Sequence, residues 1–272
     1  MPLHLEALTE QNSSEMLAWI LQEELQSIND AFAQSNKRYF LGTTPLVDKK
    51  TGKQIGKYVF TFFSNIEMQR NEILDLDIVL GNDAPVELSF NTKLKQSSDS
   101  NEYYEAVTID TEQHLIVETV NRYVIESEIE GENISIFASA FPYELTVFDD
   151  ERAFNKFCGF ENAVEVANTG MFVHGLETNF IAPGGVFSDK ANDDEAPWSF
   201  VVGVVEGFSE VTISFGENKH EAYIIYLKTA IGTLPTLAGK EMFDMQGLSK
   251  GKIIGMNAYI KANFVKDKYP QK

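Results

Sequence analysis

Hydrophobic residues near the start of the chain recur every three or four positions. Leu17, Leu21, Leu25, Ile28 and Phe32 are spaced by 4, 4, 3 and 4 residues, which places them on one face of an α-helix. Serines suited to an N-cap and an acidic first turn precede this stretch. We therefore expect an amphipathic helix of about five turns that packs against a sheet.

From Arg38 onward the hydrophobic period changes to two, which is typical of strands with one buried face. The segments 39–47 and 58–63 flank a polar, glycine-containing turn at 48–53, and this arrangement predicts a β-hairpin. Further alternation predicts strands at 74–80, 86–90, 114–120, 123–129, 134–138 and 143–148.

A short helix is expected after these strands. Acidic residues at 149–151 suit its first turn, and Gly159 follows its predicted end at Phe157 or Cys158. Beyond it, strands are expected at 200–208, 211–215, 222–227, 232–237 and 253–264, with frequent glycines between and within them. Glycines at this density indicate sharply coiled strands or a closed barrel. No repeat at a fixed period is visible.

These elements predict an α+β fold that is predominantly antiparallel β-structure. The predicted N-terminal helix packs on a sheet in a first domain, residues 1–158, and a β-rich, barrel-like domain follows at residues 159–272. A parallel α/β fold is disfavoured because helices do not alternate with strands along the chain.

Two glycine-containing segments of the second half resemble parts of an OB-fold, a small five-stranded barrel. The segment 201–207 (VVGVVEG) resembles its glycine-containing first strand, and 248–256 (LSKGKIIGM) resembles the entry to its last hairpin. The resemblance covers residues from about 200 to 264. It implies a binding surface across the middle strands, usually for oligonucleotides or oligosaccharides, and it implies no catalytic residues.

The cysteine count and the hydropathy pattern restrict the class of protein. With Cys158 as the only cysteine, an intramolecular disulfide and a zinc site built on several thiolates are excluded. The N-terminal residues lack the basic flank and apolar run of a signal peptide, and no segment approaches 18 consecutive apolar residues. We therefore expect a soluble protein in the cytoplasm.

Charge is unevenly distributed along the chain. The net charge is −19, yet residues 240–272 hold seven lysines against three acidic residues. One interpretation is a solvated basic tail after an acidic body. The other is a contact surface, either for an acidic partner or for the protein's own body.

Tyrosines and lysines of the second half are the candidate binding residues. Aromatic rings stack on bases or sugars, and lysines meet phosphates. The set is Tyr223, Tyr226, Tyr259, Lys228, Lys252 and Lys261. Nucleic acid is nevertheless not the expected partner, because the acidic body repels polyanions.

Candidate catalytic residues are few. Asp75 and Asp77 lie two apart on one predicted strand, so both carboxylates face the same side. With His114 and His174 they could form a long-range metal-assisted or acid–base site. The alternative is that the aspartates simply solvate the exposed face of a strand. No motif indicates a cofactor.

From these patterns we expect a non-catalytic cytoplasmic protein that binds a basic protein partner through its acidic body. Two alternatives stay open: a metal-assisted hydrolase that uses Asp75, Asp77, His114 and His174, and an oligonucleotide or saccharide binder that uses the C-terminal barrel. The sequence leaves the oligomeric state open.

Overall fold

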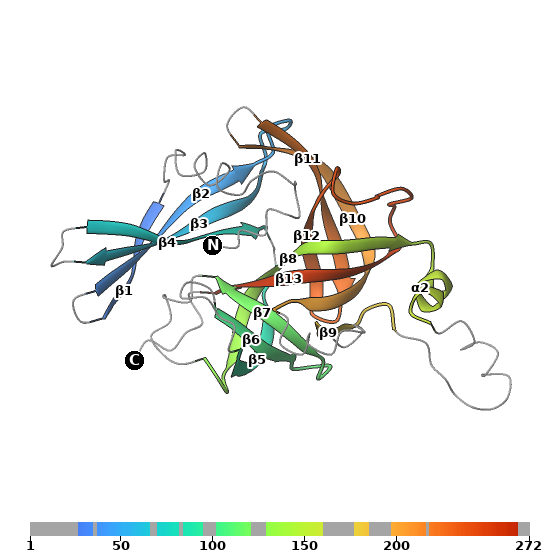
Figure 1. The fold of residues 1–272 in the computed structure, drawn as a ribbon, viewed down its shortest axis with the longest axis horizontal. Coiled ribbons are helices and arrows are strands. Elements are labelled where there is room, and N and C mark those ends of the chain that lie inside the picture. Colours follow the sequence, from blue (N-terminus) through green and yellow to red (C-terminus); the bar gives the residue numbers. More distant parts are fainter. Residues whose placement is uncertain are drawn as a thin grey trace.

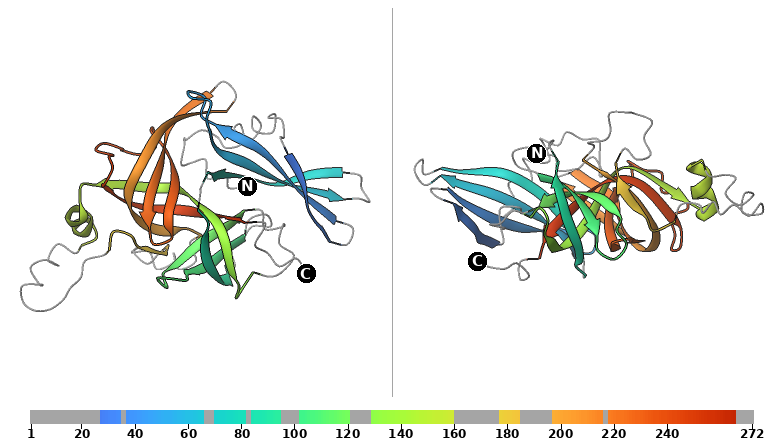
Figure 2. Two further views of the ribbon diagram at one scale, coloured as in Figure 1. Left: turned by 180° about the vertical axis from the view of Figure 1, so that it is seen from behind. Right: turned by 90° about the horizontal axis from the view of Figure 1, so that it is seen from below.

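In the part of the chain that the structure describes, the protein forms two β-sheets, mostly of antiparallel strands, and one short helix (Figure 1). The computed structural model describes residues 27–34, 37–65, 70–81, 84–94, 102–120, 129–159, 177–184, 197–215 and 218–265. A four-stranded sheet lies at one end of the molecule and the helix at the other, with the larger sheet between them (Figure 2). The described part of the chain is therefore mostly β.

The smaller sheet is an antiparallel meander in chain order. Its strands are β1 (Ser27–Gln34), β2 (Lys37–Val47), β3 (Gln54–Asn65) and β4 (Arg70–Leu80). The predicted hairpin is confirmed, since β2 and β3 pair on either side of the turn at 48–53. The strand predicted at 74–80 is confirmed as the second half of β4.

The predicted N-terminal helix on a sheet, and with it the α+β class, is wrong. Ser27–Gln34, the last part of that helix, is instead strand β1, which pairs with β2; the earlier part lies outside the described residues. The spacing of four between Ile28 and Phe32 is also two steps of period two, so this end of the pattern fits either structure. Pairing with β2 supplies the backbone hydrogen bonds that decide for the strand.

The larger sheet contains nine strands. They are β5 (Val86–Lys93), β6 (Glu102–Thr108), β7 (His114–Val120), β8 (Asn133–Phe148), β9 (Ile181–Pro183), β10 (Ser199–Phe215), β11 (Asn218–Thr229), β12 (Gly232–Gly239) and β13 (Ile253–Phe264). β7 and β13 begin and end where the sequence predicts. The two strands predicted at 134–138 and 143–148 are one long strand, β8, as are those at 200–208 and 211–215, which form β10.

Strand pairing closes this sheet into two barrels that share β8 and β13. The first barrel is β5–β6–β7–β13–β8, with β8 returning to β5. The second is β10–β11–β12–β8–β13, with β13 returning to β10. Each barrel has one parallel pair, β7 with β13 and β12 with β8. Closure leaves the barrel strands without a free edge along these ladders.

The two barrels are built from two units, β5–β8 and β10–β13, that repeat the same geometry. Phe90 of β5 exchanges backbone hydrogen bonds with the turn Gly131–Glu132 (2.6 and 3.0 Å), and Val205 of β10 does so with Gly251–Lys252 (2.8 Å each). A bulge follows Phe90 in β5 and Val205 in β10. Both turn glycines have φ above +80°, a conformation that favours glycine. The units are thus an internal repeat, although the sequence shows none.

The relation between the two units is an approximate twofold rotation. Ala140 of β8 pairs with Ile260 of β13. Ile260 also pairs with Val117 of β7, and Ala140 also pairs with Thr236 of β12. Each unit therefore donates its fourth strand to complete the barrel of the other.

One hydrophobic core runs through both barrels. Alternate residues of β13 face inward, and those from Ile254 to Phe264 join residues of β5–β8 and β10–β12 in a single buried cluster. The predicted short helix is confirmed as α2 (Glu151–Phe157), with Asp150 accepting from the amide of Ala153 (2.8 Å) as N-cap. The domain boundary predicted at 158/159 lies between β8 and β10 of this one sheet.

Asp48 fastens the β2–β3 turn to the second barrel. Its buried carboxylate accepts hydrogen bonds from the amides of Thr212 (2.8 Å), Lys50 and Thr51 (3.1 Å each). The amide of Lys49 donates to the carbonyl of Thr212 (2.9 Å). Burial of Asp48 raises its pKa, but these hydrogen bonds to the charged form outweigh burial, and its pKa lies below the ordinary value.

We expect the two barrels to unfold as one unit, because each contains a strand of both repeats. Ile254→Ala, in the second barrel, removes buried volume and should lower the free energy of unfolding by about 2–5 kcal/mol. Hydrogen exchange of β6, in the first barrel, should accelerate as much as that of β11. Acceleration confined to β10–β12 would contradict this coupling.

Asp48 should make stability depend on pH in the acid range. Because its folded pKa is lowered, its contribution is complete above about pH 4, the pKa of a free aspartate, and is lost as the pH falls through the lower folded value. Asp48→Asn should cost about 1–3 kcal/mol at neutral pH and flatten the acid side of the curve of urea-unfolding free energy against pH. An unchanged slope between pH 5 and pH 2 would contradict this assignment.

Candidate functional site

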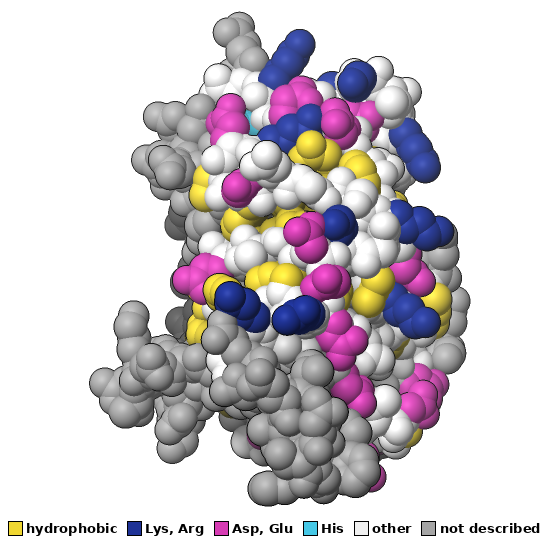
Figure 3. Space-filling model, turned by 90° about the vertical axis from the view of Figure 1, so that its right-hand side faces the viewer, with side chains coloured by type: hydrophobic (Ala, Val, Ile, Leu, Met, Phe, Trp, Pro, Cys, Tyr) yellow, Lys and Arg dark blue, Asp and Glu magenta, His cyan; other side chains and the backbone are white. Residues whose placement is uncertain are grey.

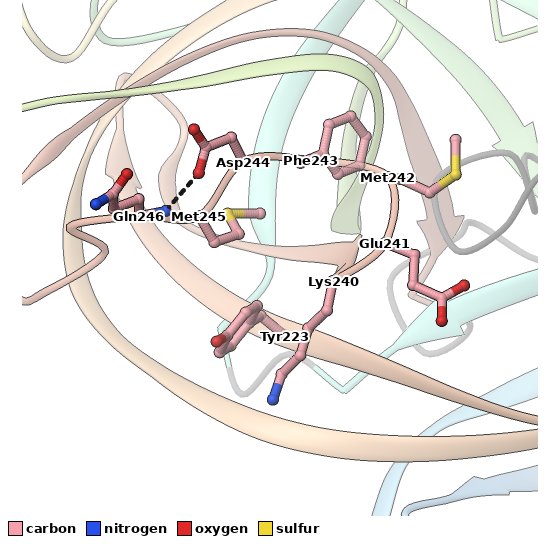
Figure 4. Close-up of a pocket in the computed structure, with 8 residues that line it drawn as sticks. All are labelled: Tyr223, Lys240, Glu241, Met242, Phe243, Asp244, Met245 and Gln246. Atoms are coloured by element: carbon pink, nitrogen blue, oxygen red, sulfur yellow. Dashed lines mark hydrogen bonds between the residues drawn. The ribbon is translucent and has the colours of Figure 1, made fainter.

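An open pocket lies beside β11, where the chain leaves β12. It is lined by Tyr223 of β11 and by the residues from Lys240 to Gln246, and Figure 4 shows the Tyr223 and Lys240 side chains extended side by side. We call it the Tyr223 pocket. The segment that forms its wall is held to the body, because Phe243, Met245 and Leu248 pack against the barrel core.

The ammonium group of Lys240 lies over the ring of Tyr223. The Nζ of Lys240 lies 4.8 Å from the centroid of the Tyr223 ring and 2.8 Å from Oε2 of Glu210, the residue that faces Tyr223 across the β10–β11 ladder. The hydrogen bond from Lys240 holds the pKa of Glu210 below its ordinary value. The same bond, together with the nearby charges of Glu210 and Glu221, raises the pKa of Lys240.

The surroundings of the pocket are acidic. Glu210, Glu221, Glu241 and Asp244 are all exposed, and we call these four residues the acidic rim. Lys240 is paired with Glu210, and Lys50 also lies close enough to act on Glu210. Two cations against four carboxylates leave the rim a local negative excess. A rim of this kind attracts cationic groups and repels phosphates.

Asp77, one of the predicted catalytic residues, lies in a buried ion cluster. The Nζ of Lys261 on β13 donates to Oδ1 of Asp77 on β4 and lies 3.6 Å from Oε1 of Glu118 on β7. All three residues are buried, with exposed fractions of 0–2%, and the ring of Phe141 lies 5.7 Å from the Lys261 Nζ. The cluster joins the smaller sheet to the barrels.

Of the other three residues of the predicted hydrolase site, the structure describes the side chain of His114 and the backbone of Asp75. The side chain of His114 is 52% exposed, and its Nδ1 lies 2.6 Å from Oε1 of Glu105. Asp75 pairs through its backbone with Thr61 of β3. The side chain of Asp75 and the whole of His174 lie outside the described residues.

The six predicted binding residues lie in separate places. Tyr223 lines the pocket, and Lys261 is in the buried cluster. Tyr226 and Lys228 are both exposed on β11. Two of the six make contacts elsewhere on the body.

Those two residues are Lys252 and Tyr259. The Nζ of Lys252 lies 2.6 Å from Oδ1 of Asp149, next to α2. The ring of Tyr259 lies 5.9 Å from that of Tyr143, which in turn meets Trp198 at 5.3 Å. The six residues therefore form no single surface.

Sequence reasoning missed Lys240 and Glu210 as site residues. They are 30 positions apart, and only the β10–β11 and β11–β12 ladders bring them to one ring. The sole signal was the excess of lysines after residue 239. Lys240, Lys252 and Lys261 each bind a carboxylate of the preceding body, which favours the interpretation that the basic segment contacts the protein itself.

The face seen in Figure 3 carries both signs of charge. Lysine and arginine side chains are interspersed there with aspartate and glutamate, between small hydrophobic areas. On the described part of this face, acidic residues are therefore interspersed with basic ones and form no continuous negative surface.

The comparisons with known proteins find no match for this chain, whether among protein-family models, curated proteins or solved structures. Within the described residues no group of three or more His, Cys, Asp and Glu is arranged to hold a metal ion. In the same part of the chain no helix has the length and hydropathy to cross a membrane.

Removal of the Lys261 charge should destabilise the protein strongly, because it leaves Asp77 and Glu118 buried without their cation. We expect Lys261→Met to cost about 3–5 kcal/mol in urea unfolding. Adding Asp77→Asn and Glu118→Gln to the same chain should recover part of that loss. If the triple variant is no more stable than Lys261→Met alone, the carboxylates are not the source of the cost.

Proposed function

We propose that this protein is a non-catalytic binding protein and that the acidic rim around the Tyr223 pocket receives a basic segment of a protein partner. The observation that carries the proposal is the pocket itself, where Glu241 and Asp244 lie in the wall beside the Tyr223 ring and Glu210 binds the Lys240 ammonium. Opposite charges across an interface speed association and fix its orientation.

The internal pairing of the C-terminal lysines also supports this proposal. Lys240, Lys252 and Lys261 are engaged by carboxylates of the same chain, so the basic segment offers fewer cations to an acidic partner. The net charge of −19 then favours basic partners. A cytoplasmic location fits this proposal as an expectation from the sequence.

The two alternatives remain predictions with less support. A nucleic-acid site is disfavoured because Lys252 and Lys261 are already paired with carboxylates. The acidic rim of the Tyr223 pocket would also repel phosphates. A metal-assisted hydrolase is disfavoured because Asp77 is bound to Lys261, whereas His114 is bound to Glu105. The OB-like character of residues 200–264 also stays a prediction; the barrel that contains β10–β13 takes its fifth strand, β8, from outside that segment.

The test uses a nine-residue peptide of alternating lysine and glycine as the basic probe, titrated by calorimetry at low salt. The wild-type chain should bind it, and binding should weaken as added salt screens the charges. Glu241→Gln with Asp244→Asn should weaken binding by roughly 2–30-fold, since exposed ion pairs contribute about 0.2–1 kcal/mol each.

The matched control is Glu130→Gln with Glu132→Gln, which removes the same charge from an exposed turn of the first barrel. It should change the affinity much less. Equal weakening by both double variants would mean that net charge alone attracts the probe and would contradict a site at the rim. A metal-induced rise in melting temperature that Asp75→Asn abolishes would favour the hydrolase instead.

A further inference from the structure

The Tyr223 pocket binds a cation of its own chain. The backbone amide of Lys240 donates to the carbonyl of Glu221 (2.9 Å), which fixes where the side chain starts. From there the ammonium reaches back over the Tyr223 ring to Glu210. The pocket therefore already combines the two features that hold a cationic side chain, an aromatic face and a carboxylate.

The ring that receives the cation is held in place. Phe208 of β10 packs with its edge against Tyr223, with the ring centroids 5.8 Å apart at 77°. Tyr223 also packs against the barrel core. A ring fixed in this way offers the same face to a cation from another molecule without reorganisation.

The internal cation is weakly held. The side chains of Lys240 and Glu210 keep exposed fractions of 28% and 48%, and ion pairs at such exposure contribute little because water screens them. A competing cation could thus displace Lys240 into solvent, where its ammonium is well hydrated.

Arginine fits these two partners better than lysine does. Its planar guanidinium stacks on an aromatic face, and its fork of N–H donors can bind a carboxylate through two hydrogen bonds at once. Glu241 and Asp244 at the pocket wall add negative charge near this position.

We propose that the Tyr223 pocket takes an arginine side chain of the basic partner, and that Lys240 occupies the same place as an internal competitor until the partner displaces it. This inference rests on the proposed function and adds to that function the identity of the side chain that is recognised. The site would then discriminate arginine-containing segments from lysine-containing ones.

The experiment compares nine-residue Arg/Gly and Lys/Gly peptides as probes of the full chain. The wild type should bind the Arg/Gly peptide more tightly. Lys240→Met removes the competitor and leaves Glu210 and Tyr223, so it should raise the affinity for the Arg/Gly peptide by about tenfold. Lys228→Met is the matched control, because it removes an exposed lysine of β11, the strand of Tyr223, outside the pocket, and it should change the affinity by less than about threefold.

A second pair of variants tests the ring and the carboxylate separately. Tyr223→Leu should abolish the preference for arginine over lysine, and Glu210→Gln should weaken both peptides. Because Tyr223 packs against the core, the melting curve of Tyr223→Leu is recorded first. If that variant does not fold, the affinities of Glu210→Gln alone test the pocket assignment.

Equal gains from Lys240→Met and Lys228→Met, or an unchanged affinity in Glu210→Gln, would overturn the pocket assignment. In that case a rim that still responds to Glu241→Gln with Asp244→Asn would leave the proposed function standing. Failure of every chain to bind either peptide would overturn both.

Discussion

The antiparallel ladder between β8 and β13 is the interaction on which the rest of the structure depends. Its twelve paired positions run from Ile253 with Phe148 to Phe264 with Ile136. One half of the ladder closes the first barrel and the other half closes the second. Because both barrels need both strands, neither repeat can bury its hydrophobic face alone. The shared core is the packing consequence of this exchange of strands.

The smaller sheet is attached to this double barrel by two polar contacts of different strength. At the β2–β3 turn, the buried carboxylate of Asp48 accepts hydrogen bonds from backbone amides, which compensate the desolvation of its charge. At β4, Asp77 shares Lys261 with Glu118 away from water. Such a cluster is a poor source of net stability but tolerates only one geometry, since any shift leaves a charge without its partner. It therefore fixes how the sheet sits on the barrels.

Much of the strand content could be predicted from alternation, and the failures have physical causes. In β13 hydrophobic and polar residues alternate from Met256 to Phe264, so its period of two is clear, whereas β7 is buried along nearly its whole length and is marked by its apolar run. At Ile28 and Phe32 a spacing of four fits both periods, and a partner strand settled the choice. The repeat of two units escaped notice because it is conserved in backbone hydrogen bonds and in turn glycines, not in side-chain identity.

The candidate site was predicted only in part. Tyr223 was named from the sequence, but its partners Lys240 and Glu210 meet it through strand pairing that no local pattern encodes. Lys261 was one of the candidate binding residues, since lysines meet phosphates, and its side chain lies on the outward face of β13. That face is outward from the barrel, but β4 covers it, and a covering element from a distant part of the chain cannot be inferred from the strand's own period.

The exchange of strands also determines when the molecule can fold during synthesis. The strands β5–β8 leave the ribosome well before β13, so the first barrel waits with an open edge at β7, whose partner Ile260 is separated from Val117 by more than half of the chain. The second barrel can close only at the same moment, because β13 belongs to both. Closure is thus a single late event that depends on contacts distant in sequence, which makes folding slow and leaves the early strands dependent on protection from aggregation.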